Sequence, residues 1–278
     1  MTTGTSRLLA LLVLVFASAG CSDTVDPFLD VDRDYTLFGF LDTDTDMQMI
    51  RVIPLRRRVD IPPSEPLDAT VTLTDLTTGG TITLRDSLVV LSDTLTGINQ
   101  PTNILIADFR PQMGHTYEIV VQGPEGKRSS ARTTVPSDIR PQIGAERFGS
   151  GIFNAITQPV SWPGVRREPF RVEVWYRVSP ATDGGSFRNV FIDYGNETGR
   201  FENGAWVVEA NYTRDRQDVA EFLQVGTLPR LYGVGMKLTY VSEDWVPPGG
   251  IFDMNALIQP GTFSNVEGGF GFFGSVAQ

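Results

Sequence analysis

The chain is poor in the two residue types that most often build metal sites and catalytic relays. Its 278 residues include a single cysteine, Cys21, and a single histidine, His115. One cysteine excludes an intramolecular disulfide framework and a thiolate zinc site. A histidine zinc site, or a serine–histidine–aspartate relay, would depend on His115 alone. The G-x-S-x-G motif of hydrolases is missing as well. We therefore expect neither a catalytic centre nor a metal cofactor.

Positive charge and long apolar runs are also scarce. The chain has 23 lysines and arginines against 33 acidic residues, a formal net charge of −10 and a pI of about 4.6. This acidic balance argues against binding nucleic acid or an anionic lipid surface by charge. The apolar stretch from Leu8 to Ala19 is shorter than the roughly 20 residues of a membrane-spanning helix. Charged residues or glycines interrupt the later apolar stretches.

The segment before Cys21 has the pattern of an export signal. Arg7 precedes the apolar stretch, and the small residues Ala17-Ser18-Ala19-Gly20 follow it. Ala-Gly-Cys resembles the lipobox of bacterial lipoproteins, which implies that the thiol carries a diacylglyceryl group and becomes the first mature residue. We predict a lipoprotein signal peptide over residues 1–20 and a covalent lipid on Cys21 that holds the protein to membrane lipid. The alternative is ordinary secretion, with cleavage after Ala19.

Residues 21–33 are acidic, contain Pro27 and lack periodicity, which predicts a tether between the lipid and a folded body. A serine at the second mature position followed by acidic residues resembles the signal that exports lipoproteins to the surface of some Gram-negative cells. The predicted location is the outer membrane facing the cell exterior. The periplasmic face, with the segment acting as a plain linker, is the alternative.

The 28 glycines and 18 prolines favour turns over long helices, and segments of period two dominate the rest. Between Tyr35 and Val135, short alternating segments recur about every ten residues, with turn residues between them. This pattern predicts an immunoglobulin-like β-sandwich over residues 34–136. No cysteine pair supports an antibody-type core.

Residues 137–278 predict a second, mostly antiparallel β domain with one short helix. Phe170 to Val178 alternates strictly between apolar and charged or aromatic residues, as in a half-buried strand. We expect the helix to begin at Thr213 as its cap and to end near Gly226. Gly233 and Gly235 are candidate bulge points. From Asp244 onward, glycine, proline and asparagine predict an irregular end. The fold class is therefore mainly β.

Three groups of residues are candidates for binding. Asp42, Asp44 and Asp46 alternate in a predicted hairpin loop and form a weak calcium candidate, although Met47 and Ile53 replace the glycine and glutamate of an EF-hand. An ordinary polar hairpin tip is the alternative. The basic run Arg56–Arg58 could grip an anion or guard a strand edge. All four tryptophans follow residue 160 and could form a sugar-binding platform or pack in a core.

The tail from Phe263 to Ser275 is the most specific motif of the folded part. Its Ser264-Asn265-Val266-Glu267-Gly268-Gly269 stretch resembles the ending of a family of Gram-negative outer-membrane lipoproteins known only as a domain of unknown function. The lipobox and the strand-like Phe38-Gly39-Phe40-Leu41 resemble the front of that family. The resemblance implies a non-enzymatic accessory protein, often found alongside TonB-dependent receptors. A carbohydrate- or peptide-binding surface module is the alternative, and a carboxylate-based hydrolase is a third hypothesis.

Overall fold

The computed structural model describes residues 33–55, 66–92, 99–149, 155–179, 187–195, 199–245 and 264–278, all within the unit Arg33–Gln278. The described residues are mainly strands, with one α-helix, α2 (Tyr212–Phe222), and one 3-10 turn, η1 (Pro124–Gly126). The prediction of a mainly β fold with a single helix is confirmed.

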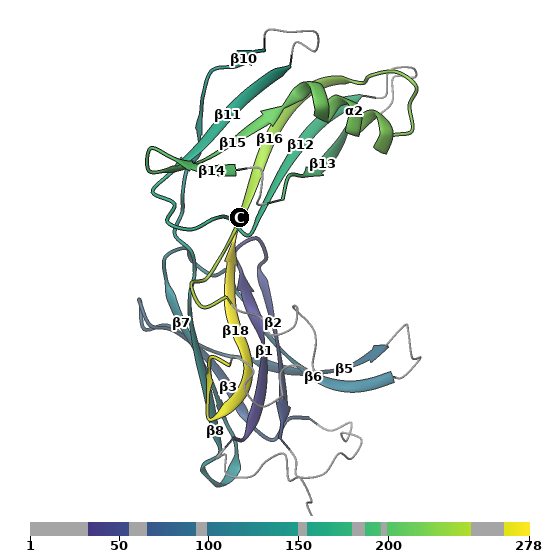
Figure 1. Cartoon of the computed structure of the whole chain (residues 1–278). Helices are drawn as coiled ribbons and strands as arrows, with labels where there is room; N and C mark the ends of the chain where they lie inside the picture. Colours follow the sequence, from purple (N-terminus) through teal and green to yellow (C-terminus); the bar gives the residue numbers. More distant parts are fainter. Residues whose placement is uncertain are drawn as a thin grey trace, which may run out of the picture. The chain divides into compact units, whose positions relative to one another are not determined.

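Two sheets face each other to form the first sandwich (Figure 1). One is part of an eight-stranded sheet: β5 (Arg85–Ser92), β6 (Asn99–Asp108), β2 (Met47–Pro54), β1 (Tyr35–Asp42) and β18 (Gly269–Ala277), in that order. The other is five-stranded: β17 (Val266–Glu267), β8 (Arg128–Thr134), β7 (Thr116–Gln122), β3 (Thr70–Asp75) and β4 (Thr81–Thr83). Alternate residues of both sheets, among them Leu37, Ile50 and Ile119, are fully buried between them. This alternation is what the period of two predicts.

The eight-stranded sheet continues into a second lobe through β16 (Arg230–Val241), β12 (Arg171–Ser179) and β13 (Arg188–Asp193). A third sheet packs against these strands: β10 (Arg147–Phe148), β11 (Ile156–Pro163), β15 (Ala205–Asn211) and β14 (Gly199–Glu202), with β9 (Gln142–Ile143) also paired to β11. The predicted face of β12 is confirmed, since Val172, Val174, Tyr176 and Val178 are fully buried. Helix α2 contributes Val219 to the same core.

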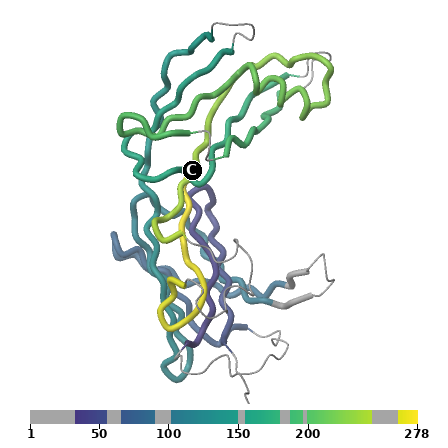
Figure 2. The backbone as a smooth tube through the Cα atoms, in the orientation of Figure 1, coloured from purple at the N-terminus to yellow at the C-terminus, as the bar shows by residue number. Residues whose placement is uncertain are grey.

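The C-terminal tail forms a strand, and the expectation of an irregular end is wrong for residues 269–277. Strand β18 pairs in parallel with β1, from Tyr35 opposite Gly269 to Asp42 opposite Val276. Figure 2 shows this yellow segment beside the purple N-terminal strands. Its last residues also pair with β16, through Ala277 opposite Tyr240 and Val276 opposite Val241. The tail that the sequence groups with residues 137–278 thus completes the sheet begun by β1.

The predicted hairpins are present with small shifts. Strands β1 and β2 flank the loop at residues 43–46, and β3 and β4 flank the turn that contains Gly79. The helix cap differs from the expectation. The side chain of Asn211, not Thr213, accepts a hydrogen bond from the Arg214 backbone, while the Thr213 hydroxyl accepts one from the Ile156 backbone. The register shift between β12 and β16 falls beside Gly233, which is one of the two glycines predicted as bulge points.

Candidate functional site

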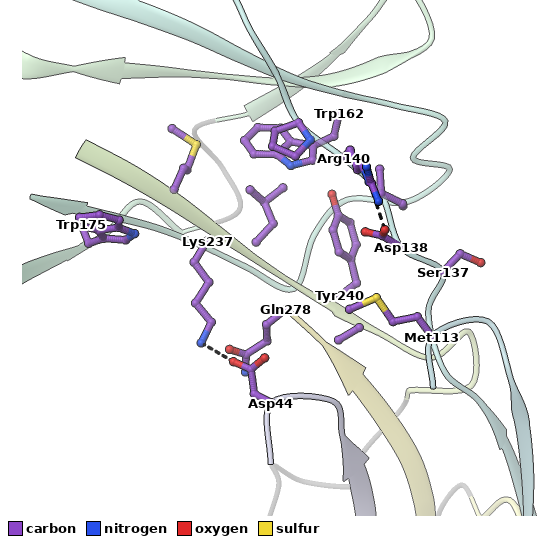
Figure 3. Close-up of a pocket in the computed structure, with 15 residues that line it drawn as sticks. Asp44, Met113, Ser137, Asp138, Arg140, Trp162, Trp175, Lys237, Tyr240 and Gln278 are labelled. Atoms are coloured by element: carbon purple, nitrogen blue, oxygen red, sulfur yellow. Dashed lines mark hydrogen bonds and ion pairs between the residues drawn. The ribbon is translucent and has the colours of Figure 1, made fainter. Parts of the chain in front are cut away.

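A cleft flanks the segment that joins β8 to β9, residues 135–141, which we call the connector. Two cavities, of about 460 and 950 Å³, share five connector residues, from Ser137 to Pro141, and Tyr240 of β16. Figure 3 shows the smaller cavity, with β16 on one side and the connector on the other. We call these two cavities together the connector cleft. Their volumes lie in the range of clefts that hold small ligands or short polymers.

Three aromatic side chains, Trp162, Trp175 and Tyr240, line the smaller cavity. Trp162 lies at the end of β11, where it is cross-strand from Trp206 and buried in the core of the second lobe. Trp175 lies on the outer face of β12, half-buried, with its ring lying across Gly235 of β16. Any side chain at position 235 would clash with that ring, since a Cβ there would lie 2.2 Å from it. Gly235, which was predicted as a bulge point, therefore leaves the space that the Trp175 ring occupies.

Tyr240 brings an unused polar group into the cleft. Its hydroxyl is buried and has no hydrogen-bond partner among the described residues, and Figure 3 shows its ring directed towards Trp162 and Arg140. Burial raises the pKa of Tyr240 above its ordinary value, so the hydroxyl stays protonated at neutral pH. Buried polar groups are nearly always hydrogen-bonded, and an exception beside a cavity is a natural contact for a bound ligand.

The charged groups of the smaller cavity form ion pairs with one another. Asp44 Oδ2 lies 3.1 Å from Lys237 Nζ, which joins the β1–β2 loop to β16. Asp138 Oδ2 lies 3.4 Å from Arg140 Nε within the connector. Both pairs are partly exposed, so they contribute little to stability. Trp162, Trp175, the Tyr240 hydroxyl and the two ion pairs together offer apolar and polar contacts to a ligand in the smaller cavity.

The structure does not bring the three calcium candidates together. Asp42 Oδ1 accepts a hydrogen bond from the Asp44 backbone at 2.9 Å, an ordinary turn contact. Asp44 pairs with Lys237, and Asp46 Oδ1 lies 2.9 Å from Arg110 Nε. Within the described ranges, no group of three or more acidic, histidine or cysteine side chains could hold a metal ion.

His115 binds a turn of the first sandwich. Its Nδ1 lies 2.8 Å from Asp75 Oδ2, and its ring stacks on Tyr117. Burial acts to raise the pKa of Asp75, but hydrogen bonds from His115, Thr78 and the Thr77 backbone outweigh it and lower the pKa to about 2. His115 lines neither cavity of the connector cleft. Asp75, the partner of His115, closes the turn after β3, so the contact between them has a structural role.

The structure contains a buried carboxylate that was not predicted from the sequence. Asp215, in the first turn of α2, is fully buried and accepts hydrogen bonds from the hydroxyls of Tyr176 and Tyr194. Arg214 donates two more, at 3.1 and 3.0 Å. Burial and the Asp215 carboxylate raise the pKa of both tyrosines. The signal was Tyr176 on an otherwise apolar strand face, because a buried phenol needs a partner. None of these residues lines the connector cleft.

The glycine-rich tail motif has a structural role. The Asn265 side chain accepts a hydrogen bond from the Phe273 backbone N–H at 2.9 Å and donates one to the Phe273 carbonyl at 2.7 Å. Gly271 has a φ of +114°, and a Cβ there would lie 1.8 Å from the Leu37 carbonyl oxygen. A Cβ at Gly269 would lie 2.4 Å from the Tyr35 carbonyl oxygen. These glycines let β18 lie against β1.

Several predictions concern residues outside the described ranges. Cys21, the signal peptide over 1–20, nearly all of the tether and the basic run Arg56–Arg58 fall there. In the described part of the chain, no helix is both long enough and apolar enough to cross a membrane.

Comparison with known proteins adds no relative to this description. No protein-family model, curated protein or solved structure matches the chain. The resemblance to outer-membrane lipoproteins therefore stays a prediction from the motifs at the two ends of the sequence.

Proposed function

We propose that the protein is a lipid-anchored, non-enzymatic accessory protein of the outer membrane that holds a partner in the connector cleft. The composition of the cleft supports this proposal: Trp162, Trp175 and Tyr240 line its smaller cavity, the Tyr240 hydroxyl has no partner among the described residues, and Asp44 and Asp138 of that cavity each pair with a cation. A carboxylate engaged by a cation is a poor general acid or base, whereas aromatic residues and arginines are typical of binding surfaces.

The cellular part of the proposal rests on the sequence. The lipobox-like Ala19-Gly20-Cys21 supports anchoring by a covalent lipid, and the acidic residues that follow support exposure at the cell surface, with the periplasmic face as the alternative. Two or more acyl chains on one residue give stable membrane attachment, which one chain does not. A TonB-dependent receptor is the partner that the resemblance of the tail suggests.

Photo-crosslinking in intact membranes tests the partner. A photoreactive amino acid in place of Met113, which lines the cleft, should give a specific adduct after illumination. The matched control is the same substitution at Ile82 on β4, because both side chains are 36% exposed and Ile82 does not line the cleft. Mass spectrometry of the adduct identifies the partner. Equal adducts from both positions, or none from position 113, would contradict the proposal.

Intact-mass measurement of the mature protein tests the anchor separately. We expect an N-terminus at Cys21 carrying acyl chains, and loss of membrane association in the Cys21→Ala variant. A mature chain that begins at Gly20 without lipid would refute the anchor and leave the binding role of the cleft standing.

A carbohydrate ligand is the second candidate, favoured by the partly exposed rings of Trp175 and Tyr240 in the wall of one cavity. Sugar rings stack on flat aromatic faces that are partly exposed. Titration with neutral oligosaccharides should then quench tryptophan fluorescence in the wild-type chain and in a Phe201→Ala control, which alters an exposed aromatic residue outside the cleft. The Trp175→Ala variant should lose the response. An unchanged titration in that variant excludes this site for sugars.

A further inference from the structure

Strand β16 has a long open edge. It pairs with β12 along Arg230 to Thr239, but on its other side the described strands contact it only at Tyr240 and Val241, through β18. The stretch from Arg230 to Thr239 therefore has a neighbouring strand on one side only within the described part of the chain. An unpaired edge is a template for another strand unless proline, bulges or charges protect it.

The hydrogen-bonding register identifies the backbone groups that point along this edge. The Tyr194 N–H donates to the Val172 carbonyl, so even-numbered residues of β12 bond to β13 and odd-numbered ones face β16. Their partners on β16 are Gly233, Gly235 and Lys237. The N–H and C=O groups of Val234, Met236 and Leu238 therefore point away from β12. Tyr240, which bonds to β18, has the same parity and continues this row.

Protection of the edge is limited to one end, where the register shift lies beside Gly233. The stretch contains no proline, and its only lysine, Lys237, is engaged by Asp44. Gly233 and Gly235 lack side chains that would hinder an approaching backbone. A strand added here would continue in line with β18, because Ala277 already pairs with Tyr240. This is the geometry by which binding modules extend their sheets with a peptide from a partner.

The two faces beside the edge differ in chemistry. On the outer face, the guanidinium of Arg177 lies 4.6 Å from the centre of the Phe187 ring, and that of Arg230 lies 5.3 Å from the centre of the Tyr232 ring. Neither arginine forms an ion pair with a described residue, although the chain has a net charge of −10. This face is suited to acidic side chains.

The inner face is apolar. A cavity of about 90 Å³ lies beside Val234 and Met236, with Ile143 and Trp162 in its wall. Ile143 and Val234 are exposed, at 71% and 41%. Successive side chains of a strand point to opposite faces. A strand on this edge would therefore place one set of side chains on the face that carries Arg230 and, one strand further from the edge, Arg177, and the other set against this cavity.

We propose that the β16 edge binds an extended segment of a protein partner in which acidic and apolar side chains alternate. A second copy of this chain is disfavoured, since its β16 edge from Arg230 to Val241 contains no acidic side chain to meet the arginines. The proposal names the chemistry of the partner and in that respect rests on the proposed function.

Fluorescence anisotropy with a defined probe tests the edge. The probe is a labelled peptide of about ten residues in which glutamate and valine alternate, titrated against the mature chain. We expect saturable binding, with none for a control peptide in which lysine replaces glutamate. The Arg177→Glu and Arg230→Glu double variant should bind the glutamate probe about tenfold more weakly.

A matched pair of variants separates the backbone from the side chain. Val234→Pro removes the N–H that points along the edge while keeping the bonds to β12, and should lower probe affinity about tenfold or more. Val234→Ala keeps that N–H and should have a smaller effect, of about threefold. Unequal protection in hydrogen exchange should accompany binding: the amides of Val234, Met236 and Leu238 become slow, and those of Gly233 and Gly235 stay as they were.

Three results would overturn the edge proposal: no saturable binding, binding that Val234→Pro leaves unchanged, or amides at 234, 236 and 238 that are already protected in the free chain. A doubled solution mass that Val234→Pro abolishes would do the same, by assigning the edge to self-association. If the probe does not bind while the photo-crosslinked adduct at position 113 still forms, only the edge proposal is refuted. If the probe binds but photo-crosslinking finds no membrane partner, the accessory role is refuted instead.

Discussion

At the scale of single residues, Asp215 is the point on which the second lobe depends most. It is the only charged side chain that is buried among the described residues, and two tyrosine hydroxyls and Arg214 satisfy it. Removing one member of such a network leaves the others without partners. The network joins helix α2 to strand β12 and to Tyr194, which follows β13, so it holds elements that are distant in the sequence.

We predict that Asp215→Ala lowers the free energy of unfolding by about 3–5 kcal/mol, because it leaves Arg214 and two phenols without their acceptor. Asp215→Asn keeps an acceptor oxygen and should cost less, about 1–3 kcal/mol. Asp218→Asn on the same helix is the control, since this half-exposed residue lies 3.8 Å from Arg214, and should change stability by about 0.5 kcal/mol or less. Urea unfolding measures all three. Equal effects at 215 and 218 would contradict the assigned network.

The lowered pKa of Asp75 predicts how the free energy of unfolding depends on pH. Its pKa is lowered to about 2 in the folded chain, below the value near 3.9 that an aspartate has when unfolded. The stabilisation is therefore present above about pH 4 and is lost as the pH falls towards 2. Asp75→Asn should remove this slope, which amounts to about 1 kcal/mol once solvent screening is allowed for. Thermal unfolding between pH 5 and 2 is the measurement, and an identical slope in the variant would argue against the Asp75–His115 contact.

At the scale of elements, β18 is the feature that most depends on glycine. Gly271 combines a positive φ with a close approach to the Leu37 carbonyl of β1. We predict that Gly271→Ala destabilises the chain by about 3 kcal/mol or more, since strain and steric clash add. Gly79→Ala isolates the first effect, because Gly79 has a φ of +82° with no atom near its missing Cβ, and should cost about 1–2 kcal/mol. Similar losses at both positions would mean that the β1–β18 contact is looser than described.

The sequence predicts those elements whose two faces differ. Strands β2 and β12 alternate between buried and more exposed residues, and both were found by their period of two, whereas β1 is buried along nearly its whole length and was predicted as the other half of the hairpin. Strand β18 was missed because its residues are buried on both faces, so apolar residues and glycines follow one another without a period. The sequence showed that this segment is rich in glycine, but it did not indicate which backbone atoms these glycines approach.

The candidate site could not be read from the sequence in the same way. Asp44, Asp138 and Lys237 are far apart along the chain, and only the pairing of β18 with both β1 and β16 brings their elements to one cleft. Spacing along a chain predicts neighbours within a helix or hairpin and carries no information on such pairings. The alternation of β12 places Trp175 on the face opposite Val174, but its contact with Gly235 required the register of β12 and β16.

At the scale of the whole molecule, the last described segment joins the two halves of the eight-stranded sheet. Strand β18 lies between β1 and β16, and Val266, Phe273 and Ala277 belong to the core of the first sandwich. In antiparallel sheets built from consecutive hairpins, loss of a terminal strand usually removes an edge. Here it would remove an internal strand, although the segment ends the chain.

We predict that a chain ending at residue 263 loses the cooperative unfolding of the first sandwich, because β1 would be left with a bare edge and Leu37 and Val135 with an opened core. The second lobe keeps its own core around Tyr176 and should retain partial protection in hydrogen exchange. Deleting Gln278 alone, an exposed residue that follows β18, is the control and should change stability by about 0.5 kcal/mol or less. Adding a synthetic peptide of residues 264–278 to the shortened chain should restore the unfolding transition in a concentration-dependent manner, because it binds only the folded form. A shortened chain that unfolds like the complete one would show that the first sandwich closes without β18, and the assignment of the tail motif to this joint would have to be abandoned.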